Sequence, residues 1–161
     1  MLHSRRRPGS ILAFGVLLLL FPAHVSQAGP ERVVVTIDRD QLRIQKIVDA
    51  FMERLTLTQK VAVSVVPRNP LMFSVEFDNA GFLLSVEEDF VGELTEEELE
   101  AAVAHELGHI WIFTHHPYLQ TEALANEVAQ RLVPRANLEQ VYEKVWRRRG
   151  TKGDLTRFIG D

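Results

Sequence analysis

Apolar residues recur at helical spacing near both ends of the chain. The spacing predicts a helix over about residues 39–55, capped by one of two nearby aspartates, with one apolar face. It also predicts a last helix that begins at Asn137 and ends at Gly150. Residues 151–161 show no such spacing and are expected to form a loose tail. The two apolar faces consist of Ile44, Ile47, Val48, Phe51 and Leu55 in the first helix and of Leu138, Val141, Tyr142, Val145 and Trp146 in the last.

The stretch that follows the first helix has residues typical of β-strands. β-Branched and aromatic residues at Val61–Val66, Met72–Phe77 and Phe82–Val86 predict three strands, the last two joined by a turn at residues 78–81. Arg32–Ile37 adds a short strand or an extended lead-in. Together these segments predict a small, mostly antiparallel sheet of three or four strands. Packed on the helices, this sheet gives an α+β fold.

A long apolar helix is expected to follow the sheet. Thr95 and Glu98 have the spacing of a capping box, in which each side chain bonds the other residue's backbone amide. The helix then runs to about Thr114, ahead of a His-Pro pair that ends it. Gly108 lies within this helix, where glycine costs about 1 kcal/mol relative to alanine. A site that needs close backbone approach would explain this glycine.

The first 28 residues have the pattern of a secretory signal. Arg5–Arg7 are followed by an apolar run at Ile11–Phe21, and Ser26-Gln27-Ala28 places small residues before a cleavage point after Ala28. A spanning helix needs about 20 apolar residues, so the run favours a cleaved signal over an uncleaved membrane anchor. We therefore expect a mature chain of residues 29–161, secreted or periplasmic, with no membrane segment and with the length of a single domain.

Composition narrows the chemistry open to this domain. The formal net charge is −4, and loss of the signal removes three arginines and no acid, which leaves −7 (−4 − 3). An acidic chain argues against nucleic acid as a partner. The chain has no cysteine, so any metal site must use histidine and carboxylate ligands. Of its six histidines, four fall between positions 105 and 116.

Two of these histidines belong to the sequence His105-Glu106-Leu107-Gly108-His109. On an α-helix, residues four apart lie about 40° apart around the axis, so both imidazoles can reach one metal ion. Glu106 lies beside them, where a carboxylate can take a proton from a zinc-bound water. This H-E-x-x-H arrangement predicts a site for one zinc ion on the central helix.

A third ligand is expected from the segment that follows. Pro117 is placed to begin a helix that runs to about Val133. Its apolar periodicity puts Glu122 on the buried face and turns Glu127 away from it, which favours Glu122. His115 is also a candidate, because it lies ten residues after His105. An unbroken helix, however, places it about 15 Å along the axis from that histidine, out of reach of the same ion. These three residues are the candidates for the third ligand.

The two motifs resemble the signature of the gluzincin metallopeptidases. The run His105–His109 followed by Glu122-x-x-Ala125-Asn126 is similar to the H-E-x-x-H and E-x-x-A-[DN] pair shared by minigluzincins, HtpX-like peptidases and ImmA/IrrE-type peptidases. The resemblance covers about residues 60–135. It implies a small zincin-like domain, in which a sheet packs on an N-terminal helix, an active helix and a helix that carries the glutamate.

The resemblance also implies roles for single residues. It assigns the zinc ligands to His105, His109 and Glu122, the general base to Glu106, and the support of a zinc-bound histidine to Asn126. For stabilising the transition state, the sequence offers Tyr118, His115 and His116.

The sequence thus predicts an exported zinc-dependent metalloendopeptidase, a hydrolase in which zinc-activated water attacks a peptide bond. Its substrate would be a peptide or protein that pairs with an edge strand, here Phe82–Val86, by β-augmentation. An alternative from another class is a zinc-stabilised binding or inhibitor module without turnover. A third interpretation is a helical core in which the histidines coincide by chance. Two measurements separate these three interpretations: the zinc content of the protein, and peptide cleavage by the wild type compared with Glu106→Gln.

Overall fold

The computed structural model of the protein describes residues 39–78 and 80–160. The predicted signal, residues 1–28, and the predicted strand at Arg32–Ile37 lie outside these residues. Within the described ranges, no helix is long and apolar enough to cross a membrane.

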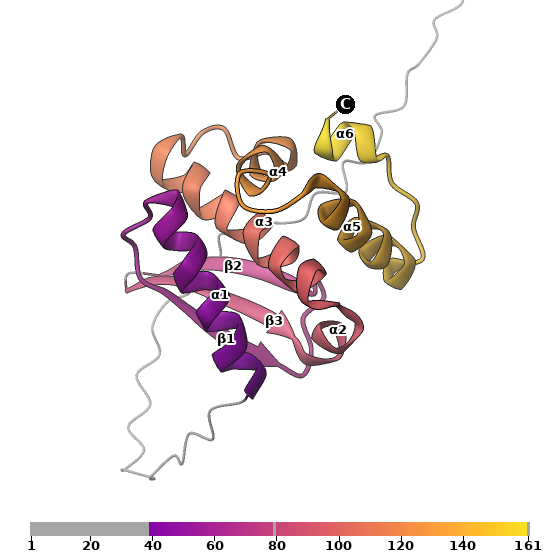
Figure 1. The fold of residues 1–161 in the computed structure, drawn as a ribbon, viewed down its shortest axis with the longest axis horizontal. Helices are drawn as coiled ribbons and strands as arrows, with labels where there is room; N and C mark the ends of the chain where they lie inside the picture. Colours follow the sequence, from indigo (N-terminus) through magenta and orange to yellow (C-terminus); the bar gives the residue numbers. More distant parts are fainter. Residues whose placement is uncertain (1–38, 79, 161) are drawn as a thin grey trace, which may run out of the picture.

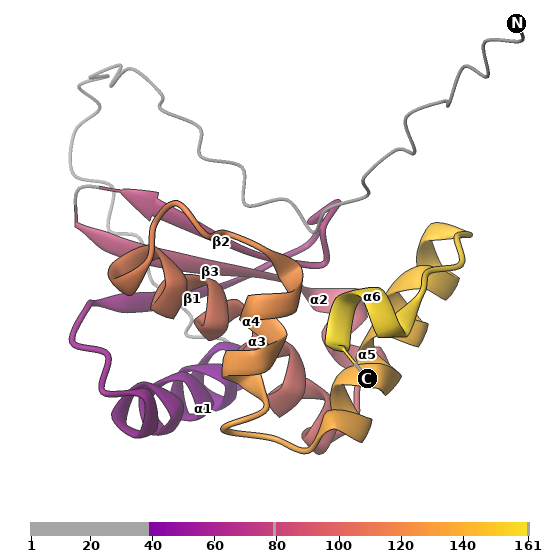
Figure 2. The ribbon, with the colours of Figure 1, turned by 90° about the horizontal axis from the view of Figure 1, so that it is seen from above.

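Helix α1 spans Arg39–Leu55 and confirms the predicted first helix. Its apolar face packs on strand β1, Val61–Val66, and on the long helix α3, Glu96–His115. Figures 1 and 2 show α1 and α3 lying across the same face of the sheet. The buried residues of α1 are ones that the helical spacing singles out, namely Ile44, Val48, Phe51 and Leu55.

The described part of the chain forms a three-stranded sheet in the order β1-β3-β2, where β2 is Phe73–Asp78 and β3 is Gly81–Glu87. Strands β2 and β3 pair as the predicted antiparallel hairpin, but β1 runs parallel to β3. The prediction of a mostly antiparallel sheet is therefore wrong for one of the two pairings. The hairpin follows from a local turn, in which Asp78 Oδ1 accepts hydrogen bonds from two backbone amides. The place of β1 depends instead on packing between segments far apart in the sequence.

The strand order also corrects the predicted substrate strand. Phe82–Val86 lies in β3, and strands occupy both of its edges, so it has no free edge for a peptide. Gly81 shows how closely β3 approaches its neighbour. Its φ is +144°, and a Cβ there would lie 2.5 Å from the carbonyl oxygen of Lys60, to which Phe82 N donates over 2.8 Å.

Helices α2 and α3 follow the sheet. The short helix α2, Glu88–Glu93, was not predicted. Helix α3 begins with the predicted capping box, which is confirmed: Glu98 N donates to Thr95 Oγ1 over 3.3 Å, and Thr95 N donates to Glu98 Oε2 over 2.7 Å. Every residue from Ala101 to Ile110 is buried, so α3 is the central helix, covered on all sides.

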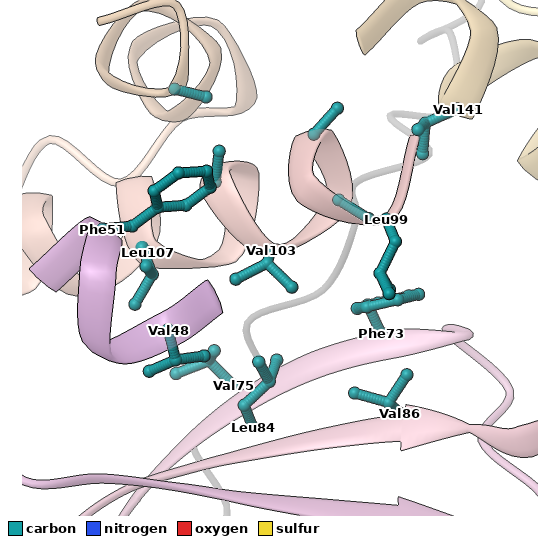
Figure 3. Packing of buried hydrophobic residues seen from close by; sticks show 14 of the residues in the cluster. Val48, Phe51, Phe73, Val75, Leu84, Val86, Leu99, Val103, Leu107 and Val141 are labelled. Carbon is teal, nitrogen blue, oxygen red and sulfur yellow. The ribbon is translucent and has the colours of Figure 1, made fainter. Parts of the chain in front are cut away.

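The hydrophobic core lies between the sheet and the helices (Figure 3). Along β3, Phe82 and Leu84 are buried and Leu83 between them is 36% exposed, as expected of a sheet with one covered face. Figure 3 shows Leu84 pointing toward Val103 of α3 and Val48 of α1. The sheet therefore positions α3, the helix that carries the candidate site.

The two helices after α3 begin at other residues than predicted. Helix α4 spans Glu122–Ala129, so Pro117 lies in a loop, and the Thr121 hydroxyl caps the helix by accepting a backbone hydrogen bond. Thr121 supplies an acceptor for an amide of the first turn, which a proline does not. Whereas α4 begins later than predicted, helix α5, Arg135–Arg149, begins before the predicted cap Asn137. It has no side-chain cap.

The residues after Gly150 do not form the predicted loose tail. Gly150 ends α5 with φ +63°, as predicted, and Leu155–Ile159 then form a further helix, α6, capped by Asp154. Helix α6 packs on α4 and α5, and Ile159 is buried (Figure 2). The prediction failed because a helix of five residues is too short to show an apolar period.

Lys144 on α5 binds the capping carboxylate of α3. Its Nζ lies 2.6 Å from Glu98 Oε2, and the Glu98 side chain is almost fully buried. Burial alone would raise the pKa of Glu98, but the hydrogen bonds from Lys144 and from the Thr95 amide outweigh it. The pKa of Glu98 therefore lies below its usual value.

Lys144→Met should lower the free energy of unfolding at pH 7 by about 1.5–3 kcal/mol, the worth of a hydrogen bond to a charged group. Because the folded state depresses the pKa of Glu98, this contribution is complete above the unfolded pKa of 4.5 and is lost as the pH falls through the folded pKa. The urea stabilities of variant and wild type should therefore converge as the pH falls from 4.5 through the lower folded pKa of Glu98. Lys46→Met, at an exposed position of α1, is the control. A gap of the same size in acid would contradict this account of the pair.

Candidate metal centre

Helix α3 places His105 and His109 one turn apart on one face, and both are buried. Their Nε2 atoms are 3.2 Å apart. Glu122, the first residue of α4, faces the pair with a side chain that is 13% exposed. Its Oε2 lies 3.4 Å from His105 Nε2, and its Oε1 lies 3.6 Å from His109 Nε2.

The spacing of these atoms suits one metal ion. Zinc bonds to imidazole nitrogen and carboxylate oxygen are about 2.0–2.2 Å long, which places tetrahedral ligand atoms about 3.3–3.6 Å apart. The distance between the two Nε2 atoms, 3.2 Å, and the distances from each to the nearest Glu122 oxygen, 3.4 and 3.6 Å, lie in or next to this range, and one ligand atom from each residue lies within 4.8 Å of the others. Two imidazoles and one carboxylate are a donor set for zinc and other divalent transition metals. His105, His109 and Glu122 thus form a group that could hold a metal ion.

Gly108 brings α4 close enough for Glu122 to reach the histidines. A Cβ at position 108 would lie 2.4 Å from the carbonyl oxygen of Ala125 and 3.0 Å from its Cα. These are backbone atoms of α4, so no side-chain rotation can relieve the contact. The glycine in the middle of α3 therefore permits the close helix approach that the sequence suggested.

The Nδ1 atom of each histidine is hydrogen-bonded to an amide side chain. His105 Nδ1 lies 2.8 Å from Oδ1 of the fully buried Asn126. His109 Nδ1 lies 3.3 Å from Gln120 Oε1, while Gln120 Nε2 donates to the His109 carbonyl over 3.3 Å. An amide oxygen only accepts, so each Nδ1 carries a proton. In each ring, Nε2 is then the atom that can offer a lone pair to a metal ion.

Gln120 and Tyr142 lie at this site although no sequence pattern predicted a part for them in it. Tyr142 was assigned to the apolar face of the last helix, and it is buried there, with its ring edge-on to that of His105 at 5.9 Å between centroids. Its hydroxyl accepts a hydrogen bond from Asn126 Nδ2 over 2.8 Å and donates to Glu122 Oε2 over 3.4 Å. A buried tyrosine needs a hydrogen-bond partner for its hydroxyl, so a tyrosine on a predicted apolar face is a signal of polar groups nearby. Gln120 lies in a loop, where no periodicity marks it.

Glu106 is buried next to the histidine pair. It lines a small apolar cavity of about 20 Å³ together with His105 and with Phe73 at the start of β2. Burial raises the pKa of Glu106 to about 7, against the opposing charge of His105 and with added repulsion from Glu122. A carboxyl group whose pKa lies near neutrality can both accept and return a proton.

The pKa values of the metal-free group place one additional proton, and so one positive charge, on the histidine pair at neutral pH. Burial lowers the pKa of His105, but the hydrogen bond and the charge of Glu122 raise it to about 8. Burial and the charge of His105 lower the pKa of His109 to about 4. At neutral pH His105 is therefore the charged ring, with protons on both nitrogens, and His109 is neutral. A metal ion must displace this proton, so metal affinity should rise with pH.

The remaining residues predicted for this site lie outside the group. Glu127 is exposed on α4. His115 is exposed at the end of α3, where its ring stacks on that of Trp111 at 4.2 Å between centroids, and His116 is exposed beside it. Tyr118 is 97% exposed. Within the described ranges, the metal-binding group does not include any of the candidates for stabilising a transition state.

The fold and the site define the class of protein: a small α+β protein in which two buried histidines and a partly buried glutamate converge. No protein-family model and no curated protein sequence matches the chain. Among solved structures, the crystal structure of the metallopeptidase zymogen of Pyrococcus abyssi abylysin is similar, with a TM-score of 0.51 and 15% sequence identity. The match covers 69% of this chain and 99% of that chain. The chain therefore has a fold like that of a metallopeptidase.

Proposed function

We propose that the protein is an exported zinc-dependent endopeptidase, a hydrolase with His105, His109 and Glu122 as zinc ligands. The observation that carries the proposal is the position of Glu106, a buried carboxyl group next to three side chains whose spacing fits one ion. A purely structural zinc site has no need of such a group. The metallopeptidase-like fold and the pattern of a secretory signal in the first 28 residues support the proposal.

The chain's own residues have separate tasks in this mechanism. A bound zinc ion would supply a Lewis acid and would lower the pKa of a water molecule. Glu106 would take the proton from that water and return it to the leaving amine, a task that suits its pKa of about 7. Asn126 and Gln120 would hold the two imidazoles, and Tyr142 would hold the carboxylate of Glu122.

The substrate would be a peptide or protein in extended conformation. In the described sheet, β2 has one edge paired with β3 and its other edge without a strand partner, which suits pairing with a peptide. Strand β2 lies by the site, because its first residue, Phe73, lines the same cavity as Glu106. We therefore assign substrate binding to β2 in place of Phe82–Val86.

A zinc-stabilised binding or inhibitor module is the second candidate. One observation favours it, namely that His115, His116 and Tyr118 are all exposed and outside the metal-binding group. Such a module would bind zinc through the same three ligands without turning over a substrate.

Metal content and cleavage test the proposal together. The purified protein should contain about one zinc ion per chain by elemental analysis, as expected of a site with three protein ligands. It should cleave unfolded casein, should lose this activity with its zinc in the presence of a chelator, and should regain both when zinc is added. Zinc without cleavage would support the binding module. A protein that binds no zinc would exclude both candidates.

A further inference from the structure

The carbonyl group of Phe158, in α6, is bonded to the amide that supports His105. Asn126 Nδ2 donates to Phe158 O over 2.8 Å, and Asn126 Oδ1 lies 2.8 Å from His105 Nδ1. A backbone carbonyl can only accept a hydrogen bond. Phe158 therefore requires the amide nitrogen of Asn126 on its side, and the amide oxygen is left for His105.

This orientation affects the opposite side of the imidazole ring. Because Asn126 Oδ1 accepts from His105 Nδ1, the nitrogen that can offer a lone pair is Nε2, which faces Glu122. The reverse orientation of the amide would set a donor against Nδ1 and would favour the tautomer that cannot bind a metal ion through Nε2. The contact from α6 thus favours the competent form of His105.

We propose that α6 is a positioning element of the metal centre, which holds Asn126, and through it His105, in the form that binds a metal ion. The proposal rests on the metal-binding part of the proposed function and not on peptide cleavage. This role is the opposite of that of a C-terminal segment that covers the metal centre and blocks it. The contact from α6 reaches Asn126, on the Nδ1 side of His105, whereas the ligand atoms meet on the Nε2 side.

Several contacts fix the path of the chain into and out of α6. A Cβ at Gly153 would lie 2.0 Å from Cζ2 of Trp146, so the chain passes directly against the indole ring. At the other end of α6, Arg135 Nη2 donates to the carbonyl of Gly160 over 2.8 Å. Between these points Ile159 is 6% exposed and belongs to the hydrophobic core. The carbonyl that meets the amide therefore has a defined position.

The presence of asparagine at position 126 agrees with this role. Its fully buried side chain donates to Phe158 and to the Tyr142 hydroxyl and accepts from His105. An aspartate would keep the acceptor for His105 but would set a carboxylate oxygen against the Phe158 carbonyl. Since Tyr142 also donates to Glu122 Oε2, the network joins α6 to two of the three candidate ligands.

The test compares the zinc affinity of full-length variants by competition with a chromophoric chelator. Ile159→Asp places a charge in the core and releases α6, whereas Thr156→Asp puts the same residue at an exposed position of the same helix. We expect Ile159→Asp to lower zinc affinity about 10- to 100-fold, the usual effect of losing a group that orients a metal ligand, and Thr156→Asp to have no effect. The visible absorption bands of the cobalt-substituted protein should change in Ile159→Asp alone.

Asn126→Asp keeps the side chain's shape and decides the question if Ile159→Asp does not fold. It should lower zinc affinity by a similar factor, because the donor to the Phe158 carbonyl is lost and the Tyr142 hydroxyl can turn away from Glu122 to donate to the new carboxylate. Wild-type zinc affinity in the folded variants would overturn the proposal. So would faster peptide cleavage at unchanged affinity when α6 is released, which is the behaviour of a blocking tail. A wild-type protein that binds no zinc would defeat the proposed function as well, a result distinct from losses confined to the variants.

Discussion

Replacing Glu106 by glutamine is expected to leave zinc bound and the fold intact, yet to lower peptide cleavage by a factor on the order of 10² to 10⁴. Glutamine has nearly the shape of glutamate but does not accept a proton at this position. Glu106 is not one of the three converging side chains, so the change removes a base without removing a ligand. Zinc content and kcat/KM on a fluorogenic peptide measure the two effects separately.

Glu122→Ala is the counterpart that separates a ligand from a base. It leaves the metal ion with two imidazoles, so zinc affinity should fall together with cleavage. Glu127→Ala makes the same change at an exposed position of α4 and should alter neither. Cleavage by Glu106→Gln at the wild-type rate would rule out the peptidase mechanism, whatever the result for Glu122→Ala.

Gly108→Ala is expected to weaken both the fold and the metal centre. The added methyl group would lie 2.4 Å from the Ala125 carbonyl oxygen, and the contact can be relieved only if the backbone of α3 or α4 moves. Overpacking of this kind costs about 1–3 kcal/mol or more, against a gain in helix propensity of about 1 kcal/mol. Because the contact is with backbone atoms, the cost lies at the upper end of this range, and we expect the free energy of unfolding to fall by about 2 kcal/mol net. A shift of α4 also carries Glu122 away from the histidines, so zinc affinity should fall on the order of tenfold or more.

Gly92 in α2 offers the matched control, because a Cβ there would meet no atom within 4 Å. Gly92→Ala should leave zinc affinity unchanged and raise the free energy of unfolding by up to about 1 kcal/mol. Urea unfolding of the metal-free proteins and chelator competition measure the two quantities. If both glycine variants behave alike, the contact between α3 and α4 at Gly108 does not hold the site together.

The parts of the fold that the sequence predicted are those with local causes. The helix over Arg39–Leu55 follows from apolar spacing, and the start of α3 follows from the Thr95 capping box. The hairpin of β2 and β3 follows from a turn. The parallel partner of β3 and the helix at Leu155–Ile159 have no such local cause, because both depend on surfaces that exist only after the chain has packed.

The candidate site divides in the same way. The i, i+4 spacing identified His105 and His109 as neighbours, and helical periodicity favoured Glu122 over an exposed glutamate five residues later. Of the groups that hold these residues, the resemblance named Asn126, but two others were not visible in the sequence. Gln120 lies in a loop, and the carbonyl of Phe158 is a backbone group, which any residue carries. Only the tertiary structure brings them to the histidines.

The two helices that supply the metal-binding group differ in how readily each can open. The histidines lie on α3, in the stretch from Ala101 to Ile110 where every residue is buried. Glu122, in contrast, is the first residue of α4, a helix of eight residues. The ends of short helices open at low free energy, while a central helix opens only when the whole protein unfolds. The group is therefore divided between a fixed pair and a carboxylate that can swing away as one helical turn frays. If a metal ion binds there, its lifetime would then be set by the fraying of α4, and it would exchange without unfolding of the whole protein.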